Sequence, residues 1–145
     1  MQNLIEMLKR HEGEVVTNDR HLIYKCPAGH WTIGIGRNVD VNGGLGLSEE
    51  EVNFLLEGDI ARVIKELSTE YAWFSDLDEV RKDAMIDISF NLGQTKLRKF
   101  VLALGAMATA DYKTASEEFL DSDWSRTVKS RSVELASMIE TGEYQ

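Results

Sequence analysis

Two short stretches near the start of the chain combine residue types that could do chemistry. The first ends in Glu12, in the last turn of a predicted helix, and the second, residues 24–38, contains Cys26 and Thr32. A carboxyl group at the end of a helix faces the negative end of the helix dipole, which favours its neutral form. If the following segment also shields it from water, Glu12 could act as a general acid. The alternative is a solvated glutamate at a helix end.

The single cysteine and all three histidines of the chain lie within residues 11–30. Such a cluster could indicate a zinc site or a thiol peptidase. The spacing fits no standard pattern of zinc ligands, however. A catalytic cysteine usually draws its histidine from far along the sequence, and residues 31–145 contain no histidine. A small cysteine that is buried or lies in a turn is the simplest interpretation of Cys26 from these residues alone.

Residues 31–36 alternate in a way that predicts a strand. Alternation would place Thr32, Gly34 and Gly36 on one face of that strand. A face made of a threonine and bare backbone would allow a ligand to approach closely. The same glycines could equally serve to pack the strand against a neighbour.

The N-terminal elements that must position these residues are one helix and a small sheet. Asn3 and Glu6 resemble a capping box at the start of the helix, and Gly13 is expected to end it. Strand-like patterns follow at 21–24 and 31–36, separated by a turn. We therefore expect a hairpin or a three-stranded sheet.

The remainder of the chain is predicted to be helical. Ser48 with Glu51 forms a capping box, and apolar residues then keep helical spacing to about residue 67. A second capping signal, Asp76 with Glu79, begins a helix that is apolar on most sides and ends at Gly93. Shorter helices are expected over about 96–106, 112–121 and 130–140, and Gly142 would end the last of them. The fold class is therefore α+β.

Length and charge restrict the possible functions. The 145 residues suit a single domain, and the net charge is −9. Residues 48–91 hold twelve acidic and four basic side chains, which predicts a solvated acidic face or an acidic docking surface. Nucleic acid is not an expected partner, because the chain lacks a large basic patch. No apolar run reaches the roughly 18 residues of a membrane span, the N-terminus does not resemble a signal peptide, and the single cysteine suits a reducing cytoplasm.

Taken together, these stretches resemble the phage-type lysozymes, glycoside hydrolase family 24. Glu-Gly, Tyr-Lys, Thr-Ile-Gly-Ile-Gly and Phe-Asn-Leu-Gly occur in the order that is specific to this family. The resemblance covers most of the chain. The matching segments are IEMLKRHEG at 5–13, LIYKCPAGHWTIGIGRN at 22–38, LSEEEVNFLLEGDI at 47–60, LDEVRKDAMIDISFNLGQTKLRKF at 77–100 and SDWSRTVKSRSVELASMIETGEY at 122–144.

The resemblance implies three catalytic residues. Glu12 matches the catalytic glutamate of the family. Cys26 matches the second catalytic position, which is usually aspartate and sometimes cysteine, and Thr32 matches the third. An inverting route is implied, in which Glu12 donates a proton while Cys26 and Thr32 position a water on the opposite face of the sugar.

Further positions follow from the same resemblance. Arg131 matches an arginine that pairs with the catalytic glutamate. Asn38 and Phe90 match residues that line the sugar-binding cleft, although Phe90 would also suit the core of its helix. Two more cleft positions are Ala103 and Glu118, where the family has neutral polar residues.

The family fold implies one lysozyme-like domain, residues 1–145, with two lobes. The small sheet lobe would span about 13–58. The helical lobe would combine about 1–12 with 59–145, and the helix over 48–67 would join the lobes on either side of a cleft.

The implied function is that of an endolysin. Such a muramidase hydrolyses the β-1,4 bond between N-acetylmuramic acid and N-acetylglucosamine in peptidoglycan, without a cofactor. We expect a monomer with no stable membrane insertion, accumulating in the cytoplasm of an infected host and reaching the wall after a lesion such as a holin makes. The alternatives are a cysteine-dependent peptidase acting on wall peptides and a non-catalytic glycan-binding module.

Overall fold

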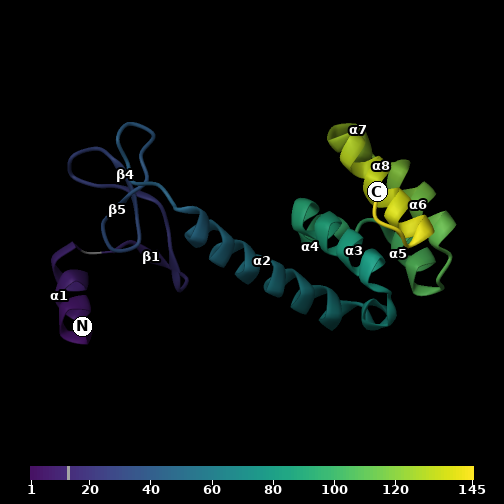
Figure 1. The fold of residues 1–145 in the computed structure, drawn as a ribbon, viewed down its shortest axis with the longest axis horizontal. Coiled ribbons are helices and arrows are strands. Elements are labelled where there is room, and N and C mark those ends of the chain that lie inside the picture. The colour runs from purple at the N-terminus through teal and green to yellow at the C-terminus, as the bar shows by residue number, and fades with distance from the viewer. Residues whose placement is uncertain (13) are drawn as a thin grey trace. The chain divides into compact units, whose positions relative to one another are not determined.

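The computed structural model describes residues 1–12 and 14–145, and the chain forms two compact units (Figure 1). The N-terminal unit comprises Met1–Phe54 and the C-terminal unit comprises Leu55–Gln145. The first contains a short helix, two small antiparallel sheets and the start of a long helix, and the second is helical. The predicted α+β class is confirmed.

The first helix, α1, spans Gln2–Glu12. It starts one residue before Asn3, and the amides of Leu4 and Ile5 donate to the carbonyl of Met1. The predicted capping box at Asn3 is therefore wrong, because this residue is already inside the helix. Gly13, which we expected to end the helix, lies outside the described residues.

A two-stranded sheet follows, formed by β1 (Val16–Thr17) and β2 (Arg20–His21). Asn18 and Asp19 join these strands, both with positive φ, as a tight hairpin turn requires. The predicted strand over 21–24 is wrong, because β2 ends at His21 and a separate strand begins at Tyr24. The turn at Asn18 and Asp19 instead pairs His21, the first residue of the predicted strand, with the preceding strand β1.

The three-stranded sheet has the order β3 (Tyr24–Lys25), β4 (Trp31–Ile33) and β5 (Arg37–Asn38). The predicted strand over 31–36 is too long. Gly34 and Gly36 have φ values of 59° and 73°, so the chain turns there instead of continuing as a strand. These two glycines belong to the turn between β4 and β5, and only Thr32 lies on the strand face predicted for all three.

The long helix α2 spans Glu49–Glu70, three residues beyond the predicted end at Leu67. Its predicted capping box is confirmed: the Ser48 amide donates to Glu51 at 2.8 Å, and the Glu51 amide donates to the Ser48 hydroxyl at 3.2 Å. At the other end, Arg98 donates to the Glu70 carboxylate at 2.7 Å. This contact across 28 residues lies at the last turn of the helix, beyond its last apolar position.

A 3₁₀ helix, η1 (Ala72–Asp76), leads into α3 (Glu79–Leu92). The N-cap of α3 is Asp78, whose side chain accepts from the Arg81 amide at 3.0 Å. The predicted cap at Asp76 is wrong by two residues, because Asp76 is used to complete η1. The predicted end at Gly93 is confirmed by its positive φ and by its amide, which donates to Ser89.

The remaining helices are α4 (Gln94–Leu97), α5 (Val101–Ala108), α6 (Tyr112–Leu120), α7 (Asp123–Val128) and α8 (Ser130–Thr141). The single helix predicted over 96–106 is interrupted at Phe100, whose side chain packs against the core. Helix α7 was not predicted. Its signal is a short N-cap, in which the Ser122 hydroxyl accepts from the Ser125 amide at 3.1 Å. Gly142 ends α8 in the left-handed conformation, as expected.

The core of the C-terminal unit is built mainly by α3, α5, α6 and α8. The central part of α3 is buried, in agreement with its predicted role as a core helix. The fully buried side chains of largest volume come from six helices: Leu67, Met85, Ile88, Leu97, Met107, Phe119 and Ile139. Burying such residues contributes about 1.5–3 kcal/mol each.

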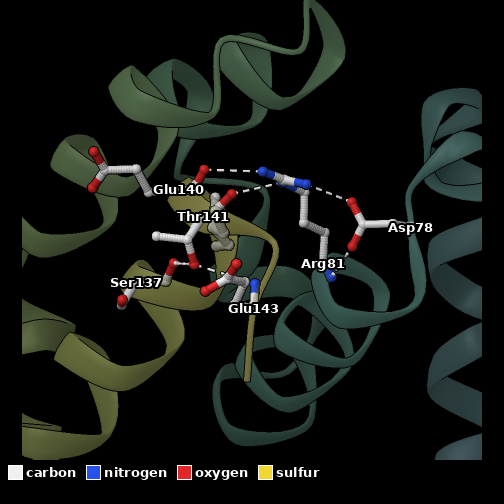
Figure 2. Close-up of polar contacts among 7 residues, drawn as sticks. Asp78, Arg81, Ser137, Glu140, Thr141 and Glu143 are labelled. Atoms are coloured by element: carbon white, nitrogen blue, oxygen red, sulfur yellow. Dashed lines mark hydrogen bonds and ion pairs between the residues drawn. The ribbon is translucent and has the colours of Figure 1, made fainter. Parts of the chain in front are cut away.

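Arg81 links the start of α3 to the end of α8 (Figure 2). Its guanidinium donates to the carbonyl of Ile139 at 2.7 Å, to that of Glu140 at 2.9 Å, and to the carboxylate of Asp78. The same group lies 3.9 Å from the ring centre of Tyr112. Because carbonyls at a helix C-terminus lack intrahelical donors, this contact satisfies the end of α8 and holds it beside α3.

Candidate active site

The predicted acid, Glu12, is the last residue of α1. Its carboxylate lies directly against Gly36, in the turn between β4 and β5. A Cβ atom added at Gly36 would be 2.8 Å from Oε2 and 3.3 Å from Cδ of Glu12. The chain therefore brings Glu12 beside the last glycine of the Thr-Ile-Gly-Ile-Gly motif, 24 positions later in the sequence.

The register of the three-stranded sheet forms a row of side chains. Tyr24 lies opposite Thr32, and Thr32 lies opposite Asn38. Residues directly opposite one another in adjacent strands share one face of the sheet. Two of the predicted site residues, Thr32 and Asn38, thus share a face with Tyr24, which the sequence did not identify. Strand alternation could have suggested Tyr24 only if the register had been known.

Thr32 is the one buried residue among those described in the N-terminal unit, at 3% exposed. Its hydroxyl donates to the carbonyl of His30 at 3.1 Å. A buried hydroxyl with a hydrogen-bond partner is held in one orientation. Thr32 therefore has a fixed position within the sheet.

Cys26 begins the tight turn between β3 and β4. Its carbonyl accepts from the Gly29 amide at 2.8 Å, and its amide donates to the carbonyl of His30 at 3.0 Å. Hydrogen bonds to the sulfur, above all from the His30 amide, hold the pKa of the Cys26 thiol below its ordinary value; partial burial opposes this shift. The structure thus brings Cys26 and Thr32 together and raises the fraction of thiolate present at a given pH.

Asn38 also organises the loop that follows β5. Its side-chain oxygen accepts from the Asp40 amide at 2.9 Å, and its carbonyl accepts from the Leu45 amide at 2.8 Å. Asp40 in turn accepts from the amides of Trp31 and Asn42, at 3.0 and 2.9 Å. These amides hold the pKa of the Asp40 carboxyl below its usual range, with the Asn42 amide as the larger cause.

In the C-terminal unit, Phe90 and Arg131 line one hollow of about 450 Å³. Phe90 is 43% exposed, so it does not belong to the core of its helix. Arg131 Nε donates to Asp87 Oδ1 at 2.8 Å, with both side chains 42% exposed. Asp87 was not predicted, and its position three residues before Phe90 on α3 is the signal that could have placed it on the same helix face. The pairing of Arg131 with Glu12 stays a prediction.

A larger hollow of about 730 Å³ in the C-terminal unit is lined by both Ala103 and Glu118. Trp124 also contributes to its wall, and its indole nitrogen donates to the side chain of Asn91 at 2.8 Å. The two positions that the resemblance assigned to a cleft therefore share one concave surface, although Ala103 itself is only 2% exposed.

The arrangement suits acid–base chemistry. Within residues 1–12 and 14–145, no group of three or more histidine, cysteine, aspartate or glutamate side chains is placed to hold a metal ion. No helix of the described chain is long and apolar enough to cross a bilayer. A carboxyl group, a thiol of lowered pKa and a fixed hydroxyl all lie in the N-terminal unit.

Comparisons with known proteins match most of the chain. The family described as phage lysozyme matches residues 9–138. An endolysin of Acyrthosiphon pisum secondary endosymbiont phage 1 is 33% identical over 120 residues, which cover 83% of this chain and 75% of the relative. A probable T4-type lysozyme of Dictyostelium discoideum is 26% identical over 98% of this chain and 96% of its own. The pre-baseplate central spike protein Gp5 of Enterobacteria phage T4 is 27% identical over 97% of this chain and 28% of its own length.

Proposed function

The chain belongs to the phage lysozyme family, and we propose that Glu12, Cys26 and Thr32 form its catalytic centre. The protein is a glycoside hydrolase of the muramidase class, an endolysin acting on bacterial peptidoglycan. The observation that carries the proposal for the site is the placement of the Glu12 carboxylate against Gly36, in the turn that follows Thr32. The bond cleaved is the β-1,4 linkage between N-acetylmuramic acid and N-acetylglucosamine.

Glu12 is proposed as the general acid. It donates its proton to the glycosidic oxygen as the bond to the anomeric carbon breaks, which leaves a neutral hydroxyl on the departing sugar. In the inverting route a water attacks the anomeric carbon from the opposite face. The water loses one proton and becomes the new anomeric hydroxyl, so Glu12 must be reprotonated from solvent before the next turnover.

Cys26 and Thr32 are proposed to position that water. The amide hydrogen bonds that lower the pKa of the Cys26 thiol increase the fraction present as thiolate, which can accept a proton from the attacking water. Thr32 supports this role, because its hydroxyl is buried and held beside the sulfur. An aspartate in place of Cys26 would be ionised over a wider range of pH.

Other assignments rest on the family resemblance. Asn38 and Phe90 are proposed to contact the glycan, and the exposed ring of Phe90 beside a hollow is compatible with stacking on a sugar. Arg131 is proposed to pair with Glu12. The predicted lobes, about 13–58 against 1–12 with 59–145, also stay predictions.

The biological setting is proposed from the same relatives. An endolysin would accumulate in the cytoplasm of an infected host as a monomer and reach the wall after a holin or a similar agent permeabilises the membrane. Cofactors and nucleic acid have no part in this proposal.

Product analysis of digested peptidoglycan tests the reaction. Incubation of purified cell walls with the protein should release new reducing sugar ends with no increase in free amino groups, and mass spectrometry should identify muramic acid at the new reducing ends. New amino termini without reducing ends would instead indicate a peptidase. Walls that bind the protein and remain intact would indicate a glycan-binding module.

A further inference from the structure

Arg37 occupies a central position among the residues of the proposed site. It is the first residue of β5, so it follows Gly36, which contacts Glu12, and precedes Asn38, which lies opposite Thr32. Its side chain forms hydrogen bonds outside its own strand, with the loop that follows β5 and with the first turn of α2.

The guanidinium of Arg37 makes three hydrogen bonds. Nη1 donates to the carbonyl of Gly46 at 2.8 Å and to Glu51 Oε2 at 3.2 Å, while Nη2 donates to Glu51 Oε1. The two nitrogens therefore hold both oxygens of one carboxylate. Such a bidentate pair has a defined geometry that a lysine ammonium cannot reproduce.

Glu51 is itself fixed by a second interaction. It is the carboxylate of the capping box at the start of α2 and accepts from the Ser48 amide at 2.8 Å. The hydrogen bond from the Ser48 amide is the largest cause that lowers the pKa of the Glu51 carboxyl, and the charge of Arg37 adds to it. Arg37 is thus joined to the N-terminus of a helix of 22 residues.

We propose that Arg37 is a positioning residue for the glycosidase reaction, which joins β5 to the start of α2 and keeps Gly36 against the Glu12 carboxylate and Asn38 opposite Thr32. This inference rests on the catalytic role proposed for Glu12 and Thr32. The guanidinium is engaged by Gly46 and Glu51, so Arg37 acts through the two residues beside it.

The physical need for such a contact follows from the size of β5. The strand has two residues, and the turn before it contains two glycines, which leave the backbone free to adopt many conformations. A strand this short is poorly held by its ladder alone. The hydrogen bonds of Arg37 to Gly46 and Glu51, here called the Arg37 fork, connect β5 to the start of α2. They thereby restrict the conformation of the turn that lies against Glu12.

The test compares substitutions at Arg37 with matched controls. Arg37→Met removes the fork and keeps most of the side chain, and Arg37→Lys keeps the charge without the bidentate geometry. Arg62→Met is a matched control, because Arg62 also joins two carboxylates, Asp59 and Glu66, but does so on α2 without contact to the sheet. Ser48→Ala is the second control, because it weakens the start of α2 and leaves the Arg37 fork intact.

Initial rates of reducing-end release, measured at equal folded concentration, give kcat and KM for each variant. Arg37→Met should lower kcat by about 10–100-fold with KM changed less than about twofold, since small misplacements of catalytic groups have effects of this size. Arg37→Lys should fall between Arg37→Met and the wild type. Arg62→Met and Ser48→Ala should keep the wild-type kcat, although Ser48→Ala should unfold at a lower temperature.

A double-mutant cycle with Glu51→Gln measures how much of the loss in kcat comes from the Arg37–Glu51 pair. If the fork is the cause, the double variant Arg37→Met/Glu51→Gln should be no less active than Arg37→Met alone. Fully additive losses would overturn the inference, and so would a wild-type kcat in Arg37→Met. A drop in kcat that Ser48→Ala reproduces would overturn it too, since general loosening of α2 would then be the cause. If the wild type itself released no reducing ends, the muramidase proposal would fail first, and the role of Arg37 with it.

Discussion

Gly36 leaves the space that the carboxylate of Glu12 occupies: a Cβ atom at Gly36 would lie 2.8 Å from Glu12 Oε2. A second glycine two residues earlier, Gly34, has a similar positive φ but no atom within 4 Å of the equivalent position. The two glycines of one turn therefore differ in their distance from the proposed acid.

Alanine at these two glycines should separate strain from function. Both Gly34→Ala and Gly36→Ala should lower the free energy of unfolding by about 1–2 kcal/mol, because the left-handed conformation is unfavourable for alanine. Gly36→Ala alone should also displace Glu12 and reduce kcat. Denaturant titrations and wall-lysis rates measure the two effects. Equal activity in the two variants would show that the contact with Glu12 has no catalytic importance.

Replacing the proposed acid should stop turnover without unfolding the protein. Glu12→Gln is nearly isosteric and removes only the ionisable proton, so the variant should fold like the wild type and release no new reducing ends. Circular dichroism and product analysis provide the comparison. If the glutamine variant still lysed walls, the general acid would have to be another residue.

The residue at position 26 should tolerate aspartate better than alanine. Cys26→Asp supplies a carboxylate of similar size that can accept a proton from water, so its activity should equal or exceed that of the wild type. Cys26→Ala should lose about 10²–10⁴-fold in rate, the usual contribution of a positioned acid–base group. An alanine variant as active as the wild type would mean that Cys26 only fills space beside Thr32.

Alkylation of Cys26 should begin at a lower pH in the folded protein than in the unfolded chain. Because hydrogen bonds hold its pKa below the ordinary thiol value of 9.0, the reactive thiolate should be present at pH values where a free cysteine is still protonated. The rate of labelling by iodoacetamide against pH should therefore have its midpoint below that of the urea-unfolded protein. Labelling should also abolish activity. Identical midpoints in folded and unfolded protein would contradict the hydrogen bonds to the sulfur.

The C-terminal tyrosine should make stability depend on high pH. The Tyr144 hydroxyl donates to Asp83 Oδ2 at 2.6 Å, which raises the pKa of Tyr144 from 10.0 to about 12. A group with a raised folded pKa stabilises the fold fully below pH 10, and this contribution is lost as the pH rises through about 12.

Tyr144→Phe isolates that effect. Its ultraviolet titration should lack the latest phenolate step of the wild type, and the difference in unfolding midpoint between the two proteins should shrink as the pH rises above 10. A difference in midpoint that is the same at all pH values would show that Asp83 and Tyr144 do not form this hydrogen bond in solution.

Local chemistry in the sequence was enough to predict several features of this protein. The capping box of Ser48 and Glu51, the end of α3 at Gly93 and the end of α8 at Gly142 depend on residues within one turn of each other. The expectation that a glycine ends the first helix likewise placed Glu12 in its last turn, and α1 ends at Glu12. Such signals can be read from sequence because their energies come from neighbours along the chain.

Predictions failed where a local signal competed with a distant one. Asp76 and Asp78 are both reasonable caps, and only the formation of η1 assigns the cap to Asp78. The strand predicted over 31–36 ended at Ile33, because the backbone of Gly34 turns toward a partner strand that alternation cannot identify.

The identities of the proposed catalytic residues came from the sequence, but their environment came from the tertiary structure. Motif order pointed to Glu12, Cys26 and Thr32 before any fold was known. Their hydrogen bonds, burial and contact with Gly36 depend on strand register, since shifting a strand by one residue moves every side chain to the other face. Register is decided by interactions between segments far apart in the chain, and this is why the folded structure was needed to place Gly36 against Glu12.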